Sequence, residues 1–323
     1  MNILVTGASG FVGLNLLERL LGSGHAVTAV SADDIPLAAR TEFERLTGKL
    51  RTARADVRDE AELERLLRES RADAVLAGAA ITSGAARERE TPAAILEVNL
   101  VAVLKLLALA ARQGVKRVVA LSSSAAIGER IFGERPVAED DAPAPVTLYA
   151  VGKAALEAAA RRWQTLSAQP EFVVARVAAV FGPWERDTGV RDALSPLHAL
   201  ASAAVRKAAV APLPDGGHRD WVYAPYLAAA LEWMLTAPRL GHTIYNVGAG
   251  TTWHPRELAQ LLGITEERGA PAIAFNDDLA RRRTHLDVRR LSAEFEPPPA
   301  PAAAAASYTQ WVSAHRTWHT DHG

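Results

Sequence analysis

Apolar and polar positions follow two different periods along the first half of the chain. Short aliphatic and β-branched runs predict strands at 3–5, 26–30, 50–55, 73–76, 115–121 and 172–177. Between them, apolar residues spaced three and four apart predict helices at 11–21, 37–46, 60–69, 92–113 and 149–166. Alternation of this kind is typical of a parallel sheet with helices on both faces. The pattern therefore predicts an α/β fold with a doubly wound parallel sheet.

The pattern becomes less regular after Gly182 and Pro183. Short helical stretches are predicted at 193–207, 226–235, 255–262 and 308–315, with brief strands near Val210 and Thr243. We expect residues 1–178 to form the sheet domain. Residues 179–323 should form a smaller lobe over the carboxyl ends of the strands, with the chain returning to the core domain. A Pro/Ala-rich stretch at 297–306 predicts a spacer before the last helix.

A turn with three glycines joins the first strand to the first helix. Gly7, Gly10 and Gly13 lack a Cβ, so the backbone can turn tightly and approach a phosphate near the first helical amides. Asp33 follows the second strand, 20 residues after Gly13, where a carboxylate binds the adenosine ribose of a dinucleotide. A glycine triplet alone fits a plain loop equally well. In this context it favours a Rossmann-type dinucleotide-binding domain over residues 1–178.

Composition argues against several classes of function. The 36 basic and 37 acidic residues give a net charge of −1 without a basic block, so neither nucleic acid nor a membrane is an expected partner. The chain has no cysteine, and its nine histidines contain no zinc-binding motif. His315, His319 and His322 lie near a C-terminal end that we expect to fray, so no metal is expected. With no basic leader and no apolar run of transmembrane length, we expect a cytoplasmic protein that binds small molecules.

The helix predicted at 92–113 is apolar on nearly every face over its middle, apart from Lys105. A helix of this kind must be covered on both sides. We expect one side to meet the sheet and the other to meet a second copy of the chain. The expected partner is a homodimer that forms through the helices at 92–113 and 149–166.

Tyr149 and Lys153 are four residues apart, which places them on one face of a helix. The phenol has a pKa near 10, so a base that works near pH 7 needs a stabilisation of roughly 4 kcal/mol. A lysine ammonium at about 4 Å contributes about that amount at an effective dielectric near 20. By itself the pair is more often a surface tyrosine with a solvated lysine.

A serine run, Ser122 to Ser124, ends the fifth strand at the same edge of the sheet. A dehydrogenase needs a base for the carbinol proton while the hydride leaves for nicotinamide. Hydroxyl donors from Ser123 or Ser124 would stabilise the charge on the substrate oxygen. The serines, the tyrosine and the glycine turn together favour a catalytic role for Tyr149 and Lys153.

At this point the chain closely resembles the extended short-chain dehydrogenase/reductase family, in its NAD-dependent epimerase/dehydratase group. The motifs that carry the resemblance are Thr6-Gly-Ala-Ser-Gly-Phe-Val-Gly13, Asp56-Val57, Ala79-Ala80, Asn99, Ser122-Ser-Ser124, Tyr149 with Lys153, Arg176 to Gly182-Pro183, Arg219-Asp220-Trp221 and Tyr245-Asn-Val-Gly248. The resemblance implies cofactor contacts from Gly7, Ser9, Gly10, Phe11, Val12, Gly13, Asp33, Asp56, Val57, Ala79, Ala80, Asn99, Ser122, Tyr149 and Lys153. It implies catalysis by Ser124, Tyr149 and Lys153, and substrate contacts from Ser123, Ser124, Arg219 and Arg283.

Several positions depart from the family pattern. Ser31 lies where many relatives place the ribose-binding acid, so Asp33 would take that role. No arginine follows the second strand closely, which predicts NAD as the cofactor, with NADP possible. The dehydratases follow the catalytic hydroxyl with Asp-Glu, whereas Ala125 and Ala126 follow Ser124 here, so dehydration is disfavoured. Ala179 replaces an asparagine that sugar-nucleotide epimerases use at the diphosphate.

The sequence thus predicts an NAD(P)-dependent oxidoreductase or epimerase. Hydride would pass between nicotinamide and a carbinol carbon of an anionic, carbohydrate-type substrate, either a sugar nucleotide or a sugar acid. Arg219 and Asp220 are neighbours on an extended segment and point to opposite sides, so we expect one of them to face the cleft. The alternative is a catalytically silent dinucleotide-binding sensor or scaffold, against which the intact Ser124, Tyr149 and Lys153 argue.

Overall fold

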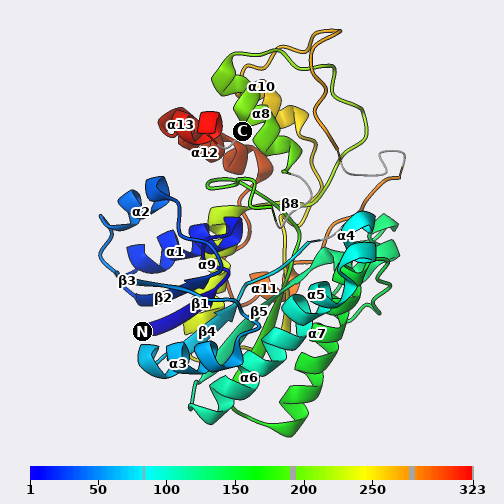
Figure 1. Cartoon of the computed structure of the whole chain (residues 1–323). Helices are drawn as coiled ribbons and strands as arrows, with labels where there is room; N and C mark the ends of the chain where they lie inside the picture. The colour runs from blue at the N-terminus through cyan, green and yellow to red at the C-terminus, as the bar shows by residue number, and fades with distance from the viewer. Residues whose placement is uncertain (83, 190–193, 276–280, 322–323) are drawn as a thin grey trace.

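A computed structural model describes residues 1–82, 84–189, 194–275 and 281–321, and its main feature is a parallel sheet (Figure 1). In sheet order the strands are β3 (Lys49–Arg54), β2 (Ala26–Ser31), β1 (Asn2–Thr6), β4 (Ala74–Ala77), β5 (Arg117–Ser123), β6 (Glu171–Val177) and β9 (Ile244–Val247). The chain changes its direction of winding between β1 and β4, which opens a crevice at the carboxyl ends of these strands. The predicted doubly wound Rossmann-type fold is confirmed.

Helices cover both faces of this sheet because the strands are apolar on both sides. Ile3 and Val5 of β1 pack into one core with α1 (Phe11–Gly22) and α9 (Ala224–Thr236). Leu4, between them, packs into a second core on the opposite face. The helices of that second face are α3 (Glu60–Ser70), α6 (Ala102–Arg112) and α7 (Leu148–Leu166). A short helix, α2 (Leu37–Phe43), packs beside α1.

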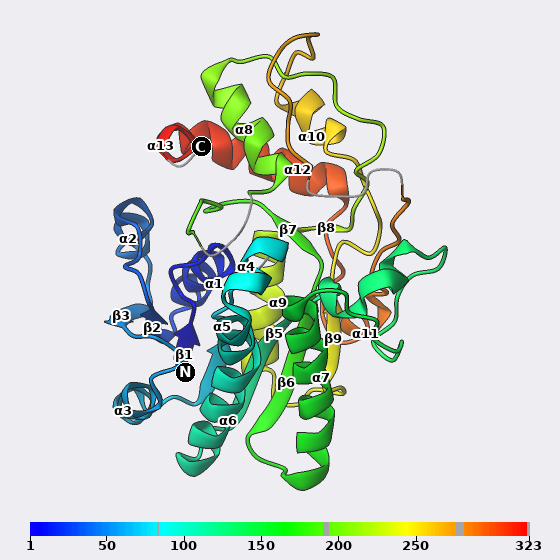
Figure 2. The same cartoon turned by 45° about the vertical axis from the view of Figure 1, so that its right-hand side comes forward.

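A smaller lobe lies over the carboxyl ends of the strands (Figures 1 and 2). Two short strands, β7 (Ala179–Phe181) and β8 (Trp221–Tyr223), form its own parallel pair. Its helices are α8 (Pro196–Arg206), α10 (Arg256–Leu261), α12 (Pro301–Ala314) and α13 (Arg316–Asp321). The chain returns to the sheet domain as α9, β9 and α11 (Arg289–Ser292), so the two units are interleaved after residue 178.

The C-terminal segment is more ordered than the sequence indicates. The predicted spacer at 297–306 is wrong from residue 301 on, because α12 begins at Pro301 and its alanines are strong helix formers with a proline at the first position. The expected fraying is also wrong for residues up to 321, since Trp318 and His319 are buried. His315 stacks on Trp311, with ring centres 4.3 Å apart. His322 lies outside the described residues.

The helix predicted at 92–113 consists of three continuous parts: α5 (Pro92–Leu96), a π-helical turn η1 (Glu97–Val101) and α6. It is preceded by α4 (Ala85–Glu90), which the sequence pattern did not predict. Residues 92–112 are long and apolar enough to span a membrane by length and composition, so the expectation that no such run occurs is wrong. Half of this stretch is buried against the protein, as in a core helix.

Candidate active site

A cavity of about 560 Å³ lies at the carboxyl ends of the strands, between the sheet and the second lobe. The glycine turn, the strand ends and the second lobe all contribute to its walls. The predicted cofactor residues that line it are Gly7, Ser9, Gly10, Phe11, Val12, Gly13, Asp33, Asp56, Val57, Ala79, Ala80, Ser122, Tyr149 and Lys153. The predicted substrate residues that line it are Ser123 and Arg219. Asn99, Ser124 and Arg283 are not among the lining residues.

The glycine turn fits the pyrophosphate of a dinucleotide. Gly7 has a φ of +69°, and a Cβ there would lie 2.6 Å from the Ala79 amide nitrogen. The turn and β4 can therefore lie this close only because Gly7 has no side chain. Gly10 is the N-cap of α1 and offers no side-chain cap, so the first amides of the helix are available to an anion.

The adenosine end of the cavity holds both acids and arginines. Ser31 Oγ accepts a hydrogen bond from the Ser9 amide at 2.9 Å. Asp33 lines the cavity beyond it, and the Arg58 guanidinium lowers the pKa of the Asp56 carboxyl. Although no arginine follows the second strand closely in the sequence, an arginine lies beside the end of that strand in the fold. Arg54, from the neighbouring strand β3, donates to the Ala32 carbonyl at 2.8 Å.

Tyr149 and Lys153 enter the cavity from the first two turns of α7. Thr147 caps this helix by accepting a hydrogen bond from the Ala150 amide at 3.1 Å. Lys153 Nζ donates to the Leu121 carbonyl at 2.8 Å and lies 5.5 Å from the centre of the Tyr149 ring. Burial lowers the pKa of the Lys153 ammonium to about 8, so the group remains mostly charged at pH 7. A cation thus lies beside the phenol, as the chemistry of a tyrosine base requires.

The three serines at the end of β5 have different surroundings. Ser122 Oγ donates to Glu157 Oε1 at 2.7 Å. Ser123 Oγ accepts from the Ala125 amide at 3.1 Å, and its side chain belongs to the cavity wall. Ser124 begins the 3-10 helix η2 (Ser124–Phe132) and is half-buried. Ser122 and Ser123 therefore both line the cavity whereas Ser124 does not, and the catalytic role of Ser124 stays a prediction.

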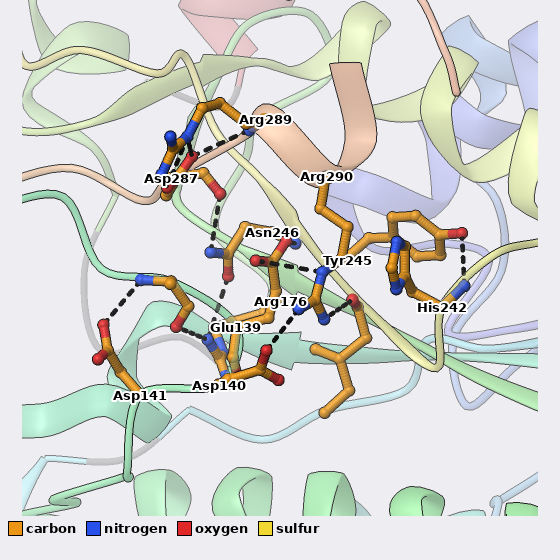
Figure 3. A network of polar contacts seen from close by, with 12 residues as sticks. Glu139, Asp140, Asp141, Arg176, His242, Tyr245, Asn246, Asp287, Arg289 and Arg290 are labelled. Atoms are coloured by element: carbon orange, nitrogen blue, oxygen red, sulfur yellow. Dashed lines mark hydrogen bonds and ion pairs between the residues drawn. The ribbon is translucent and has the colours of Figure 1, made fainter. Parts of the chain in front are cut away.

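A buried polar network lies behind the serines and was missed in the sequence. Arg176 of β6 is fully buried and binds Glu157 of α7 through Nε at 2.9 Å and Nη2 at 2.6 Å. Arg176 Nη1 donates to Asn246 Oδ1 of β9 at 3.2 Å, and Asn246 Nδ2 donates to the Asp287 carbonyl at 3.0 Å (Figure 3). The signal for it in the sequence was Glu157, four residues after Lys153 on the same face of the helix.

Arg219 belongs to the second-lobe wall, and a second arginine cation, Arg283, lies near it without lining the cavity. Burial, and to a smaller extent the like charge of Arg283, lower the pKa of Arg219 to about 9. The Arg219 guanidinium lies 5.3 Å from the centre of the Trp221 ring, and that of Arg283 lies 4.8 Å from the centre of the Phe132 ring. Because the two cations repel each other, an anion bound near Arg219 would be favourable.

Asp220 faces away from the cavity. Its carboxylate accepts hydrogen bonds from the Ala249 amide at 2.6 Å and from the Leu286 amide at 3.0 Å, while burial raises its pKa to about 6. Arg219, its neighbour, lines the cavity. The structure thus has the two side chains on opposite sides, as alternation along an extended segment predicts.

Asn99 supports the cavity without lining it. It is fully buried in the π-helical turn, and its Nδ2 donates to the Ile81 carbonyl at 2.8 Å and to the Ile95 carbonyl at 2.9 Å. Ile81 belongs to the cavity wall. Asn99 therefore holds the segment after β4 in place.

Among residues 1–82, 84–189, 194–275 and 281–321, no group of three or more acidic or histidine side chains could hold a metal. Two members of the C-terminal histidine cluster have other contacts. His315 Nε2 lies 2.8 Å from Glu42 Oε1, and the His319 ring lies 5.0 Å from that of His198.

Known proteins resemble this chain over most of its length. The sequence profile of the NAD dependent epimerase/dehydratase family matches residues 3–248. UDP-glucose 4-epimerase of Mycolicibacterium smegmatis is 30% identical over 262 residues, 80% of each protein. The structure of UDP-glucose 4-epimerase from Thermotoga maritima with UDP-glucose has a TM-score of 0.77 at 23% identity, over 97% of this chain and 99% of that one. MoeE5 in complex with UDP-glucose and NAD has a TM-score of 0.74 at 25% identity, also over 97% and 99%.

Proposed function

The chain belongs to the NAD-dependent epimerase/dehydratase family, and from this premise we propose that it uses NAD to epimerise a carbinol carbon of a nucleotide-linked sugar. The observation that carries the proposal is the position of Tyr149 and Lys153. Both line the same cavity as the glycine turn, and the ammonium lies 5.5 Å from the centre of the phenol ring. A base beside the place for nicotinamide is what alcohol oxidation needs.

Each residue at the cavity has a separate role in the proposed reaction. NAD, which the glycine turn from Gly7 to Gly13 would hold, would supply the hydride acceptor and donor. Tyr149 removes the proton from the carbinol oxygen and later gives it back. Lys153 favours the phenolate by its charge, and Ser123 can donate to the substrate oxygen. Epimerisation needs the oxidised sugar to turn within the cavity, and the adjacent wall of β6 and β7 carries only small or aliphatic side chains, Val177, Ala178, Ala179 and Val180.

We propose an anionic substrate because Arg219 lines the second-lobe wall and a second cation, Arg283, lies near it. A guanidinium binds phosphate through two parallel hydrogen bonds, so the pair suits the diphosphate of a nucleotide sugar. The relative from Mycolicibacterium smegmatis is named as a UDP-glucose 4-epimerase, which makes UDP-hexoses the first substrates to test. Ala179 leaves the diphosphate without the family's asparagine. A sugar acid, oxidised without return of the hydride, is therefore the second candidate.

We also propose a homodimer through α5, α6 and α7, with the protein acting in the cytoplasm. Val101 in the π-helical turn and Val151 in α7 are each 42% exposed. The silent sensor is disfavoured because the comparisons align the chain with enzymes and because Tyr149 and Lys153 keep their places at the cavity. No further partner is proposed.

The test is turnover of UDP-glucose, UDP-galactose, UDP-glucuronate and neutral sugars by the purified protein, followed by NMR and by nicotinamide absorbance. We expect interconversion of 4-epimers without net absorbance change. Arg219→Ala should raise KM by about tenfold or more at an unchanged Tm, the loss of a charged hydrogen bond. A lasting absorbance change with a sugar acid would establish net oxidation instead. Dinucleotide binding without any turnover would support the sensor.

A further inference from the structure

Arg186 comes from the second lobe and reaches the cofactor side of the cavity. Its Nη2 donates to the Ser9 carbonyl in the glycine turn at 3.2 Å. Its Nε is buried and has no hydrogen-bond partner among the described residues. Thr188, two residues further on, belongs to the cavity wall. A guanidinium with an unused, buried donor therefore lies beside the turn that fits a pyrophosphate.

The segment that carries Arg186 is fixed to α1. Asn15 Nδ2 donates to the Pro183 carbonyl at 2.8 Å, and Trp184 Nε1 donates to Glu18 Oε2 at 2.7 Å. Trp184 itself is fully buried. Since these contacts surround the residues just before it, Arg186 is held over the turn before any cofactor binds, and little side-chain freedom is lost on binding.

The carboxylate of Asp33, the predicted ribose ligand, attracts the Arg186 guanidinium. Burial lowers the pKa of the guanidinium, and attraction by Asp33 and then Asp187 opposes that shift. Arg54 approaches the same place from β3, donating to the carbonyl of Ala32 at 2.8 Å. Arg58 is not available in the same way, because its fork is bound to Asp56 at 2.6 Å. Asp33, which lines this end of the cavity, thus has two cations near it, Arg54 and Arg186.

We propose that Arg186 is a cofactor-specificity residue, which offsets the repulsion between Asp33 and a 2′-phosphate so that the protein binds NADP(H) as well as NAD(H). A free ribose hydroxyl can use Asp33 as an acceptor, whereas a 2′-phosphate can use the Arg186 fork, with Arg54 adding positive charge. The second lobe then influences which dinucleotide enters the sheet domain. The inference rests on the proposed function only in placing a dinucleotide in this cavity.

The test measures dissociation constants of NADH and NADPH by their fluorescence, and of 5′-AMP and adenosine 2′,5′-bisphosphate by calorimetry, with cofactor-free protein. We expect wild-type NADPH affinity to lie within about tenfold of NADH affinity. Arg186→Ala should weaken NADPH and the bisphosphate by about tenfold to a hundredfold, the range for one charge-assisted hydrogen bond. NADH and 5′-AMP should change by less than about threefold. Arg186→Lys, which keeps the charge without the fork, should fall between the two.

The matched control is Arg239→Ala, which removes the same charge from an exposed position between α9 and β9, at the opposite end of the sheet. It should change none of the four constants. Equal weakening of NADH and NADPH by Arg186→Ala would overturn the inference, because the arginine would then only support the glycine turn. Wild-type NADPH binding more than a hundredfold weaker than NADH binding would also overturn it. Failure of both dinucleotides to bind would instead remove the proposed function, and this inference with it.

Discussion

Lys153 keeps a charge in a position where only 2% of its surface meets water. Burial disfavours the ammonium, and the hydrogen bond to the Leu121 carbonyl satisfies only one of its three donors within the described residues. A buried cation of this kind lowers the stability of the protein while it makes the neighbouring Tyr149 a better base. Function and stability therefore make opposite demands on this side chain.

The pH dependence of stability should report this conflict. The pKa of Lys153 is about 8 in the folded protein, below the value of roughly 10.4 in an unfolded chain. Between these values the unfolded chain binds more protons, so the free energy of unfolding should rise with pH across that window. Lys153→Met should lack this contribution. Urea unfolding of both cofactor-free proteins from pH 7 to 10 tests it, and parallel curves would contradict the assignment.

Tyr149→Phe tests the proton path separately from cofactor binding. The ring and its place beside Lys153 remain, and only the hydroxyl is lost. We expect kcat to fall by at least the roughly hundredfold that general acid–base catalysis contributes, with the dissociation constant of NADH nearly unchanged. Single-turnover kinetics and fluorescence titration provide the two numbers. A variant that kept most of its kcat would mean that another group takes the proton.

The roles of single residues were predictable where the residues that act together lie within a few positions of one another in the sequence. The glycine turn, Tyr149 with Lys153, and Arg219 against Asp220 all follow from spacing within a few positions. Arg54 and Arg186 were missed because they reach the ribose end from a neighbouring strand and from the second lobe. The positions of these two arginines in the sequence do not indicate their contacts. The contacts form only because β3 pairs with β2 and the second lobe packs over the sheet.

At the scale of elements, α7 is fixed to the sheet by two contacts one turn apart. Lys153 donates to the end of β5, and Glu157 binds both Ser122 of β5 and Arg176 of β6. Helix α7 cannot rotate or slide without separating the buried Arg176 guanidinium from the Glu157 carboxylate. We infer that this pair sets where Tyr149 lies in the cavity.

Glu157→Gln should therefore lower both stability and turnover. Removing one partner of a buried pair costs about 3 to 5 kcal/mol. The control is Glu64→Gln, since Glu64 pairs with Arg112 at 3.5 Å where both side chains are 43% and 54% exposed. That change should cost less than about 1 kcal/mol. Denaturant unfolding and kcat measured well below the melting transition test the pair, and equal effects in both variants would contradict the special role of Glu157.

Helices and strands were predictable where the spacing of apolar residues stays regular over the whole element. The strands of the parallel sheet and the helices that cover it lie within a few residues of their predicted places. The long apolar stretch gave no sign of the π-helical turn at 97–101, which turns Asn99 towards Ile81. The stretch at 297–306 looked like a spacer because proline and alanine carry little periodicity. The alanines favour a helix, and packing against α10 in one hydrophobic core stabilises the second half of that stretch as a helix.

At the scale of the whole molecule, the sequence predicted one sheet and a lobe over its carboxyl edge, but not how the two are joined. After residue 178 the chain crosses between them repeatedly, with α9 and β9 in the sheet domain and α8, α10 and α12 in the lobe. The lobe is therefore tied to the sheet by several connections and by Arg186 at the glycine turn. Such crossings follow from tertiary packing, which a hydrophobic pattern does not encode.

The proposed dimer would form through helices that cover one face of the sheet. α5 and the π-helical turn lie against α7 on one side of the sheet (Figure 2), and Val101 and Val151 are each 42% exposed there. A charge at these positions would be buried in the proposed dimer contact without a partner, at a cost of several kcal/mol. We expect Val101→Glu with Val151→Glu to convert a dimer into a monomer. Light scattering after size-exclusion chromatography measures this directly.

The control for the dimer is Leu261→Glu on α10, a leucine that is 49% exposed in the second lobe, away from α6 and α7. It adds the same kind of charge to an exposed apolar position and should leave the mass unchanged. A wild-type protein that is monomeric at micromolar concentration would refute the dimer outright. A double variant that stays dimeric would place the contact elsewhere. Because association stabilises only the folded state, a true dimer should melt at a temperature that rises with protein concentration. That dependence should disappear in the double variant.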